Sequence, residues 1–342
     1  MKKWGAVCTL IGIVSFAFSG TEAGRSSRLA AAGPEVEVAP EKLEHPGTKR
    51  ALILCGLPGD KEHRQPFAET VEKIRGALIE RYGFTAPEIR VQFGGPVAEG
   101  EGPVLAGVRG RATREEIETE AAELRQVLKP QDTLWVIVIG HTHYDGKHAH
   151  FNIPGPDLNE QEFGKLFAGL EAREQVFFIT IPASGYFIKP LSAKGRVVIT
   201  ATEADLEINE TLFPLALADV LAAPPEPAEF DADHEGNRTL FDLYIALARN
   251  VAKRYSDDEL LPTEHSLLDD NGDGRGTELQ IDYLPIEQGG RAQAGKNPPS
   301  LRENGDGKLA SRIELPAPPP LPAEKPPVQK SPEREADDDK PN

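Results

Sequence analysis

Cysteine is almost absent from this sequence. The chain has two cysteines in 342 residues, Cys8 and Cys55, and the first lies in an amino-terminal segment that we expect to be removed. One remaining thiol cannot form an internal disulfide, so burial of apolar area must stabilise the fold. The chain is long enough for this, because one domain of roughly 200 residues removes most of its apolar surface from water.

Basic residues are scarce relative to acidic ones. The chain has 38 Lys and Arg against 55 Asp and Glu, which gives a formal net charge of −17. Binding to nucleic acid requires clustered Lys and Arg, so we expect no nucleic-acid partner. Long apolar runs are also missing beyond the amino terminus, so we expect no stable membrane span in a soluble mature protein. The sequence predicts no particular oligomeric state.

The amino terminus has the layout of a secretory signal. Lys2 and Lys3 precede an apolar stretch over residues 4–18, and small residues at Thr21 and Ala23 offer a cleavage point before residue 24. The stretch is too short for a comfortable membrane span. We therefore expect residues 1–23 to direct export to a periplasmic or extracellular location, with an uncleaved anchor as the alternative.

Composition divides the rest of the chain. Residues 24–48 are rich in Ala, Glu, Pro and Gly, which predicts a disordered linker, and residues 291–342 are predicted to be a low-complexity tail that becomes Pro-rich and acidic from residue 315. A second Pro-rich linker is expected at residues 223–230. These segments leave an α/β domain at residues 49–222 and a helical region at residues 231–290.

Residues 49–222 alternate apolar runs with amphipathic segments. The expected strands lie at residues 50–56, 88–95, 132–141, 175–181 and 195–202. Helices are expected to begin at Pro66, Thr113 and Asn159 and to span residues 211–221, with a loop at residues 96–112. Strands separated by helices predict a mainly parallel sheet with helices on both faces. Ligands gather beyond the carboxyl ends of such strands, here residues 57–64, 141–151, 181–186 and 200–207.

The order of elements around the third strand is informative. A buried strand ends in Gly140–His141, a loop reading FNIPGPDL leads into a helix, and the next strand is followed by Ser184–Gly185. This order resembles the caspase and legumain peptidases, in which one strand ends in the catalytic histidine and the next in Cys-x-Ser-Gly. The resemblance covers residues 49–222 and implies a caspase-like fold.

The same resemblance implies that His141 is the catalytic base and that Pro182 stands at the nucleophile position. Proline has no nucleophilic side chain, and the attacking species in this family is a thiolate. Thr142 also replaces a glycine that usually follows the histidine. Cys55 could substitute, although its apolar strand favours a buried core residue, and Ser184 could act with His141 as its base.

Two further residues are implied as substrate ligands. Arg64 resembles the arginine that these peptidases use to hold an acidic or amide side chain, because a guanidinium binds a carboxylate through two parallel hydrogen bonds. Thr202 lies in the small-residue segment that lines the pocket in the family. The alternative for Arg64 is a solvated arginine at the start of a helix.

The loop after the third strand is rich in histidine. His141, His143 and Asp145 match most of the HxHxDH pattern of metallo-β-lactamase-like hydrolases, and His148 and His150 follow. Zinc hydrolysis needs three or more ligands and an open water position, and the last histidine of the pattern is replaced by Gly146. Zinc binding by His143, Asp145, His148 and His150 therefore competes with a polar loop of solvated histidines.

Two acidic loops resemble EF-hand calcium loops. EF-hand spacing lets oxygen ligands surround one hard cation while a glycine permits the sharp bend. The candidate ligands of the first loop, followed by a predicted helix, are Asp231, Asp233, Glu235 and Asp242. Those of the second are Asp269, Asn271, Asp273 and Glu278. Calcium is thus the possible cofactor, and acidic turns that merely mimic the motif are the alternative.

Three classes of function are consistent with these patterns. The leading interpretation is an exported pseudopeptidase that binds a peptide or protein at the strand ends without cutting it. The second is an active hydrolase that uses Ser184 with His141 or a zinc ion, and the third is a structural envelope protein without a small ligand.

Overall fold

The structure is a computed structural model that describes residues 47–95, 105–204, 207–292 and 297–317. The predicted signal segment, nearly all of the linker at residues 24–48 and the tail beyond residue 317 lie outside these residues. All described residues fall within one compact unit. No helix among them is both long and apolar enough to cross a membrane.

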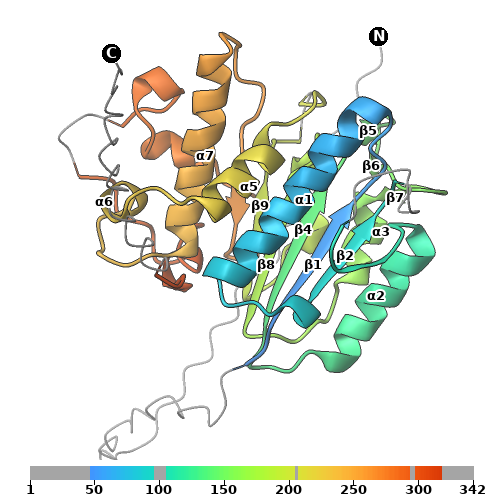
Figure 1. The fold of residues 1–342 in the computed structure, drawn as a ribbon. Coiled ribbons are helices and arrows are strands. Elements are labelled where there is room, and N and C mark those ends of the chain that lie inside the picture. The colour runs from blue at the N-terminus through green and yellow to red at the C-terminus, as the bar shows by residue number, and fades with distance from the viewer. Residues whose placement is uncertain (1–46, 96–104, 205–206, 293–296, 318–342) are drawn as a thin grey trace, which may run out of the picture. The chain divides into compact units, whose positions relative to one another are not determined.

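The centre of the fold is a sheet in the order β10-β9-β8-β4-β1-β2-β3 (Figure 1). All neighbouring strands are parallel except β10, which runs antiparallel to β9. The five predicted strands are confirmed, and two short edge strands were not predicted. The strands are β1 (Lys49–Cys55), β2 (Ile89–Phe93), β3 (Val108–Gly110), β4 (Thr133–Ile139), β8 (Glu174–Ile179), β9 (Arg196–Thr200) and β10 (Leu267–Asp269).

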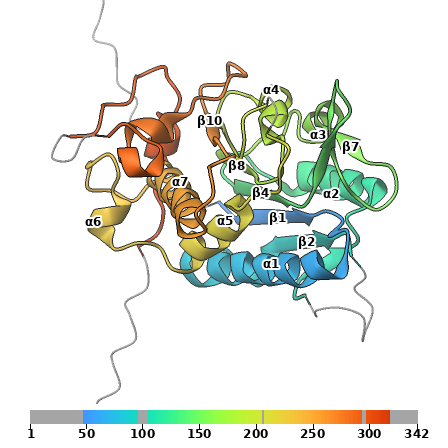
Figure 2. The same ribbon diagram turned by 90° about the horizontal axis from the view of Figure 1, so that it is seen from above.

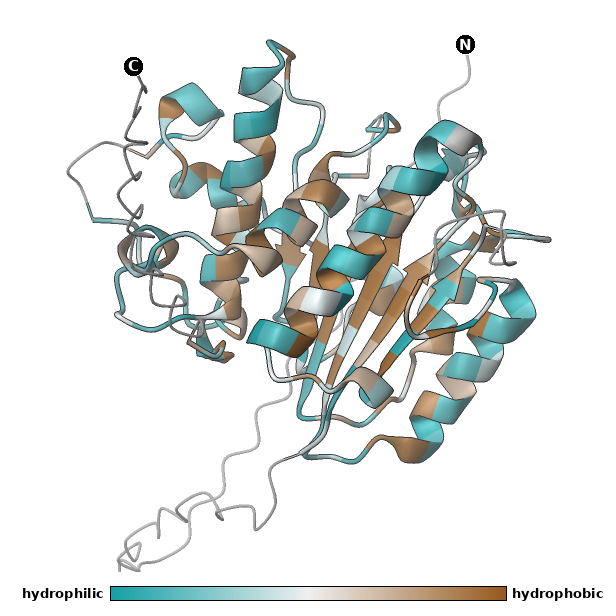
Figure 3. Cartoon of the chain, viewed as in Figure 1, coloured by the Kyte–Doolittle hydropathy of each residue, from teal (hydrophilic) through white to brown (hydrophobic). Residues whose placement is uncertain are grey.

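Helices cover both faces of this sheet (Figure 2). Side chains alternate along β1, so that Ala51, Ile53 and Cys55 enter one apolar core while Leu52 and Leu54 enter the other. Figure 3 shows the apolar strands between helices whose outer surfaces are hydrophilic. The first core is covered by α1 (Lys61–Arg81), α5 (Phe213–Ala222) and α7 (Leu240–Asp257), and the second by α2 (Arg114–Val127), α3 (Glu160–Leu166) and α4 (Ile188–Leu191).

Helix α1 begins at Lys61, earlier than the predicted start at Pro66. Asp60 is the N-cap, because its side chain accepts the backbone N–H of His63 at 3.0 Å. Pro66 therefore lies inside the helix, and the additional turn carries His63 and Arg64 to the carboxyl end of β1. The predicted caps of α2 and α3 are confirmed: the Thr113 side chain caps α2, and Asn159 forms a capping box with Glu162.

The segment between β4 and α3 forms a small antiparallel sheet. Its strands are β5 (Thr142–Tyr144), β6 (Ala149–Phe151) and β7 (Leu158–Asn159). The sequence predicted only a polar loop here. The predicted loop at residues 96–112 is wrong in its last part, because β3 pairs with β2 at the sheet edge.

The predicted division of the carboxyl-terminal half is wrong at two places. The Pro-rich linker contains α6 (Pro227–Phe230), and Phe230 is fully buried in the same core as the sheet. The predicted tail is folded over residues 297–317, where Ala310, Ile313 and Leu315 enter that core. Ile313 accepts the backbone N–H of Leu240, so the tail pairs with the residues that begin α7.

The predicted helical region contains one long helix, α7, followed by strand β10 and two short 3-10 helices. The second acidic loop follows strand β10 instead of a helix, since Asp269 is the last residue of that strand. It therefore lacks the helix–loop–helix arrangement of an EF-hand. The remaining short helices are η1 (Ala86–Glu88), η2 (Ser184–Phe187), η3 (Leu279–Asp282), η4 (Ile286–Gln288) and η5 (Ala310–Arg312).

Candidate functional site at the strand ends

Four parallel strands bring polar residues to one edge of the sheet. β1, β4, β8 and β9 are consecutive neighbours, so the segments after them share the carboxyl-terminal edge, where α/β sheets bind ligands. These segments are residues 56–63, 140–142, 180–185 and 201–204. The edge is therefore the first place to look for a functional site.

His141 follows β4 at this edge and is half-buried. Gly140 before it has φ +143, and a Cβ there would lie 3.2 Å from the backbone nitrogen of Gly56, so only glycine fits between the ends of β4 and β1. The His141 Nε2 atom lies 3.2 Å from the carbonyl oxygen of Pro58. Its ring contacts His63 and Phe67, with centroid separations of 5.1 Å in each case.

His63 is a component of the edge that sequence reasoning did not assign. Its Nδ1 lies 2.8 Å from the Asp60 carboxylate and its Nε2 3.2 Å from the Glu210 carboxylate. The hydrogen bond with Asp60, assisted by the charge of Glu210, raises the pKa of His63 above its ordinary value. His63 could have been recognised from the sequence, because it follows the first strand and directly precedes Arg64, the predicted substrate ligand.

Arg64 lies in the second turn of α1 and is half-buried. Its role as a substrate ligand stays a prediction.

The turn after β8 approaches the end of β9 closely. Pro182 is buried, and Ala183 adopts a left-handed conformation with φ 52 while its N–H bonds to the carbonyl of Glu207. A Cβ on Gly185 would lie 2.5 Å from the backbone nitrogen of Ala204, so this position requires glycine. The predicted nucleophile position thus carries a buried proline in a tightly packed turn.

Ser184 and Thr202 bind each other across this turn. Both side chains are fully buried, and their hydroxyl oxygens lie 3.0 Å apart. The Ser184 N–H donates to the Thr202 hydroxyl, and the Thr202 N–H donates to the Ser184 hydroxyl. Among the described residues, no hydrogen bond joins Ser184 to His141. The predicted substrate ligand and the alternative nucleophile therefore hold the ends of β8 and β9 together.

Cys55 is the last residue of β1, and its side chain is completely buried in the core. Burial raises the pKa of its thiol, because a thiolate is poorly solvated among apolar side chains. Cys55 therefore does not supply the thiolate that is missing at Pro182.

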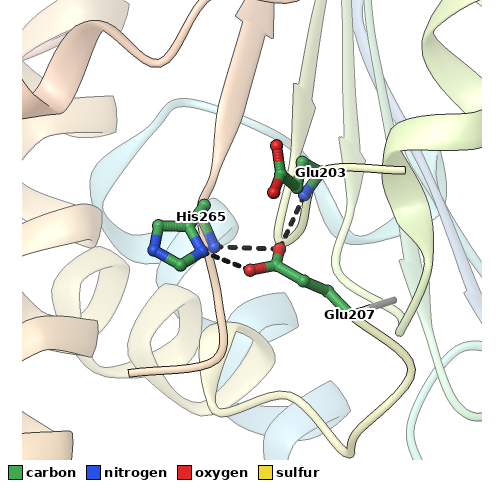
Figure 4. A group of neighbouring side chains, drawn as sticks. All are labelled: Glu203, Glu207 and His265. Atoms are coloured by element: carbon green, nitrogen blue, oxygen red, sulfur yellow. Dashed lines mark hydrogen bonds and ion pairs between the residues drawn. The ribbon is translucent and has the colours of Figure 1, made fainter. Parts of the chain in front are cut away.

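Beside β9, Glu203, Glu207 and His265 form a group that was not predicted (Figure 4). One Glu207 oxygen accepts the backbone N–H groups of Glu203 and His265 at 2.8 and 3.1 Å, and the other pairs with His265 Nδ1. Burial opposes ionisation of Glu207, but the hydrogen bonds from His265 and Glu203 outweigh it and lower its pKa. The hydrogen bond with Glu207 raises the pKa of His265. Glu207 and His265 therefore form an ion pair that links the end of β9 to the segment before β10.

Glu264 lies next to this ion pair and binds the start of α5. Its carboxylate accepts the N–H groups of Leu212 at 2.5 Å and Phe213 at 3.0 Å, and the Tyr255 hydroxyl at 2.9 Å. Burial raises the pKa of Glu264 to about 7, despite these hydrogen bonds. A carboxylate from outside the helix thus satisfies amides at the α5 amino terminus.

The histidine-rich hairpin does not collect its predicted zinc ligands at one point. His143 bonds to Asn152, His148 to Glu160, and His150 to Asp145. Among the described residues, no three of these side chains place ligand atoms within 4.8 Å of one another. The described geometry therefore gives zinc binding here no support.

In the first acidic loop, the structure brings three of the four predicted calcium ligands together. Carboxylate oxygens of Asp231, Asp233 and Asp242 lie within 4.8 Å of one another, whereas Glu235 is exposed. Burial raises the pKa of Asp233 and Asp242, and repulsion between neighbouring carboxylates adds to it. Gly236, the predicted turn glycine, has φ +80.

In the second loop, the predicted ligands are divided between different surroundings. Asp269 is buried, while Asn271 and Asp273 are exposed. Glu278 interacts electrostatically with His265, Glu203 and Glu207, the group beside β9. The described residues do not form one ligand group in this loop.

No protein-family model matches this sequence, and no curated protein shows significant similarity to it.

Proposed function

We propose that this chain is a non-catalytic relative of the caspase and legumain peptidases that binds a peptide or protein at the strand-end edge. One observation carries the proposal. The neighbouring parallel strands β4 and β8 deliver His141 and the Pro182–Gly185 turn to the same edge of the sheet. That is the arrangement in which the family resemblance places a catalytic histidine beside a cysteine, here replaced by proline.

The surroundings of these residues support loss of catalysis. Attack on a carbonyl requires a nucleophile within hydrogen-bond reach of its base. Pro182 has no such group, the Ser184 hydroxyl is engaged by Thr202, and Cys55 is enclosed in the core. A hydrolase that uses Ser184 would have to break the Ser184–Thr202 pair, which leaves buried polar atoms unsatisfied.

Retention of polar and aromatic groups at the edge supports binding. His63 and His141 are both half-buried, and they contact each other and Phe67. The His141 imidazole, whose Nε2 lies beside the Pro58 carbonyl, can hydrogen-bond to the backbone of an extended peptide through Nδ1, whereas both nitrogens of His63 are held by Asp60 and Glu210. A structural envelope protein without a small ligand would not require such groups at this edge.

Binding and hydrolysis are tested together on a library of fluorescent decapeptides that contain Asp, Asn, Lys or Arg at the centre. We expect specific binding without cleavage, weakened in His141→Ala. The matched control is His234→Asn, because His234 is exposed, lies elsewhere in the chain and has φ 61, a conformation that asparagine tolerates. Cleavage that His141→Ala abolishes would show that catalysis survives, and equal binding by His141→Ala would remove this edge as the site.

Calcium binding in the first acidic loop is a second, separate proposal. The convergence of Asp231, Asp233 and Asp242 favours it, and so does one Asp231 oxygen that is buried without a hydrogen-bond partner. Millimolar calcium should raise the melting temperature, since a ligand at 100 times its Kd stabilises a fold by about 2.7 kcal/mol. Asp233→Asn should remove the rise and Asp273→Asn should keep it. A melting temperature that is indifferent to calcium would discard the site.

A further inference from the structure

An apolar groove leads away from the strand-end edge. It lies between the first three turns of α1, residues 209–215 around the start of α5, and residues 255–263 at and beyond the end of α7, with a volume of about 630 Å³. Leu260 and Leu261 are 57% and 86% exposed. The apolar side chains that line it are Pro66, Phe67, Leu212, Pro214, Leu215, Leu260 and Leu261.

The groove joins the proposed binding edge through His63. His63 lines the groove, and its ring contacts His141 at the edge. Phe67 also lines the groove and contacts both histidine rings. The groove and the strand-end edge therefore meet at His63 and Phe67.

All charged side chains that line the groove, apart from the titratable His63, are acidic. They are Glu62, Glu210 and Asp258, and among the side chains that the structure describes the lining contains neither Lys nor Arg. Glu210 is paired with His63, whereas Glu62, on α1, and Asp258, after α7, are exposed. An apolar surface with an acidic border is complementary to a ligand that combines aliphatic and cationic groups.

We infer that the groove binds a peptide segment in which Lys or Arg stands next to a large aliphatic residue. This inference rests on the proposed function and specifies which peptides the edge accepts. The aliphatic side chain covers Leu260 and Leu261, and the cation lies between Glu62 and Asp258. The acidic border repels anionic membranes and nucleic acids, and the net charge of −17 disfavours a second copy of this chain.

Fluorescence anisotropy with four labelled decapeptides tests the inference on the full chain. The central residues of the probes are Leu-Lys-Leu, Leu-Arg-Leu, the neutral Leu-Gln-Leu and the polar Ser-Arg-Ser. We expect the first two to bind tightest and to lose affinity as salt is added, because exposed charges are screened. Combining Glu62→Gln with Asp258→Asn should weaken them about fivefold, and Leu261→Ser about tenfold, since a large exposed leucine no longer becomes buried on binding.

Matched variants control for general effects on charge and surface. Glu118→Gln removes an exposed helical carboxylate from α2, and Ile286→Ser removes an exposed aliphatic side chain, 70% accessible, outside the groove. Both should bind the basic probes like the unmodified chain. Circular dichroism of every variant checks that the fold is retained.

The outcomes separate this inference from the function on which it rests. Tight binding of the neutral probe, or groove variants that bind like their controls, would overturn the groove while leaving peptide binding at the edge intact. Groove-dependent binding of basic probes that His141→Ala leaves unchanged would overturn the role of the edge and keep the groove. If none of the four probes bound, the groove assignment would be refuted, and the wider decapeptide library would decide the proposed function.

Discussion

The buried carboxyl group of Glu264 makes a prediction about stability and pH. Glu264 accepts the amides that begin α5 and the hydroxyl of Tyr255 on α7, and it is only 8% exposed. Its pKa is raised from an ordinary value of 4.5 to about 7 because burial disfavours the charged form. Above about pH 7, therefore, the folded chain must hold a poorly solvated carboxylate, which lowers the free energy of unfolding.

The magnitude follows from proton linkage. Between pH 4.5 and about pH 7 the folded chain retains a proton on Glu264 that the unfolded chain has lost. The free energy of unfolding contributed by this group therefore falls as pH rises through that window, by about 3 kcal/mol in total. Below the window both states are protonated, and this cost is absent.

Glu264→Gln should remove this pH dependence while retaining an acceptor for one of the two α5 amides. Urea unfolding from about pH 4.5 to about pH 8.5, followed by the fluorescence of buried Trp135, measures it. We expect the variant to gain about 3 kcal/mol relative to the unmodified chain across that range. Other titrating groups, such as Glu207 and His265, are present in both proteins and largely cancel. Parallel pH curves for the two proteins would refute the reasoning.

Three further predictions concern the strand ends. Cys55 should react with iodoacetamide only after unfolding, because its thiol is buried and its pKa is raised; mass spectrometry that finds rapid native labelling would contradict this. Ser184→Ala should lower the free energy of unfolding by about 2 kcal/mol, since it deprives buried Thr202 of its partner, yet keep peptide binding; lost binding in a folded variant would contradict a purely structural role. His265→Ala should lower the melting temperature more near pH 6 than near pH 9. The raised pKa of His265 means that protonated His265 stabilises the fold, and this stabilisation is lost as pH rises through that pKa. An equal decrease in melting temperature at both pH values would argue against an ion pair with Glu207.

Local sequence signals were sufficient for the central sheet and for two helix starts. β4 was recognisable because an unbroken apolar run is what a strand buried on both faces requires. Thr113 and Asn159 were recognisable because a capping side chain bonds to an amide only a few residues away. The position of His141 followed from its place after β4, since parallel strands end at a common edge.

Features that depend on distant partners could not be predicted in this way. β10 is a short strand that exists because it pairs with β9, and the tail at residues 297–317 folds because a few apolar residues, such as Ile313, reach the core from a polar background. The start of α1 was missed because the residues between Asp60 and Phe67 are polar and show no apolar period. His63 was not recognised as part of the site because Glu210 is 147 residues away.

The long-range contacts that escaped prediction are also those that build the groove. Residues 255–264 supply one wall through Tyr255 and Leu261 and, through Glu264, the acceptor for the α5 amides. α5 in turn packs against both α1 and α7, so the groove crosses the junction of these three helices. A ligand that fills the groove touches both sides of this junction and must stabilise it by mass action. Binding at the groove and folding of the carboxyl-terminal half are therefore thermodynamically linked, although the sequence places the residues responsible nearly 200 positions apart.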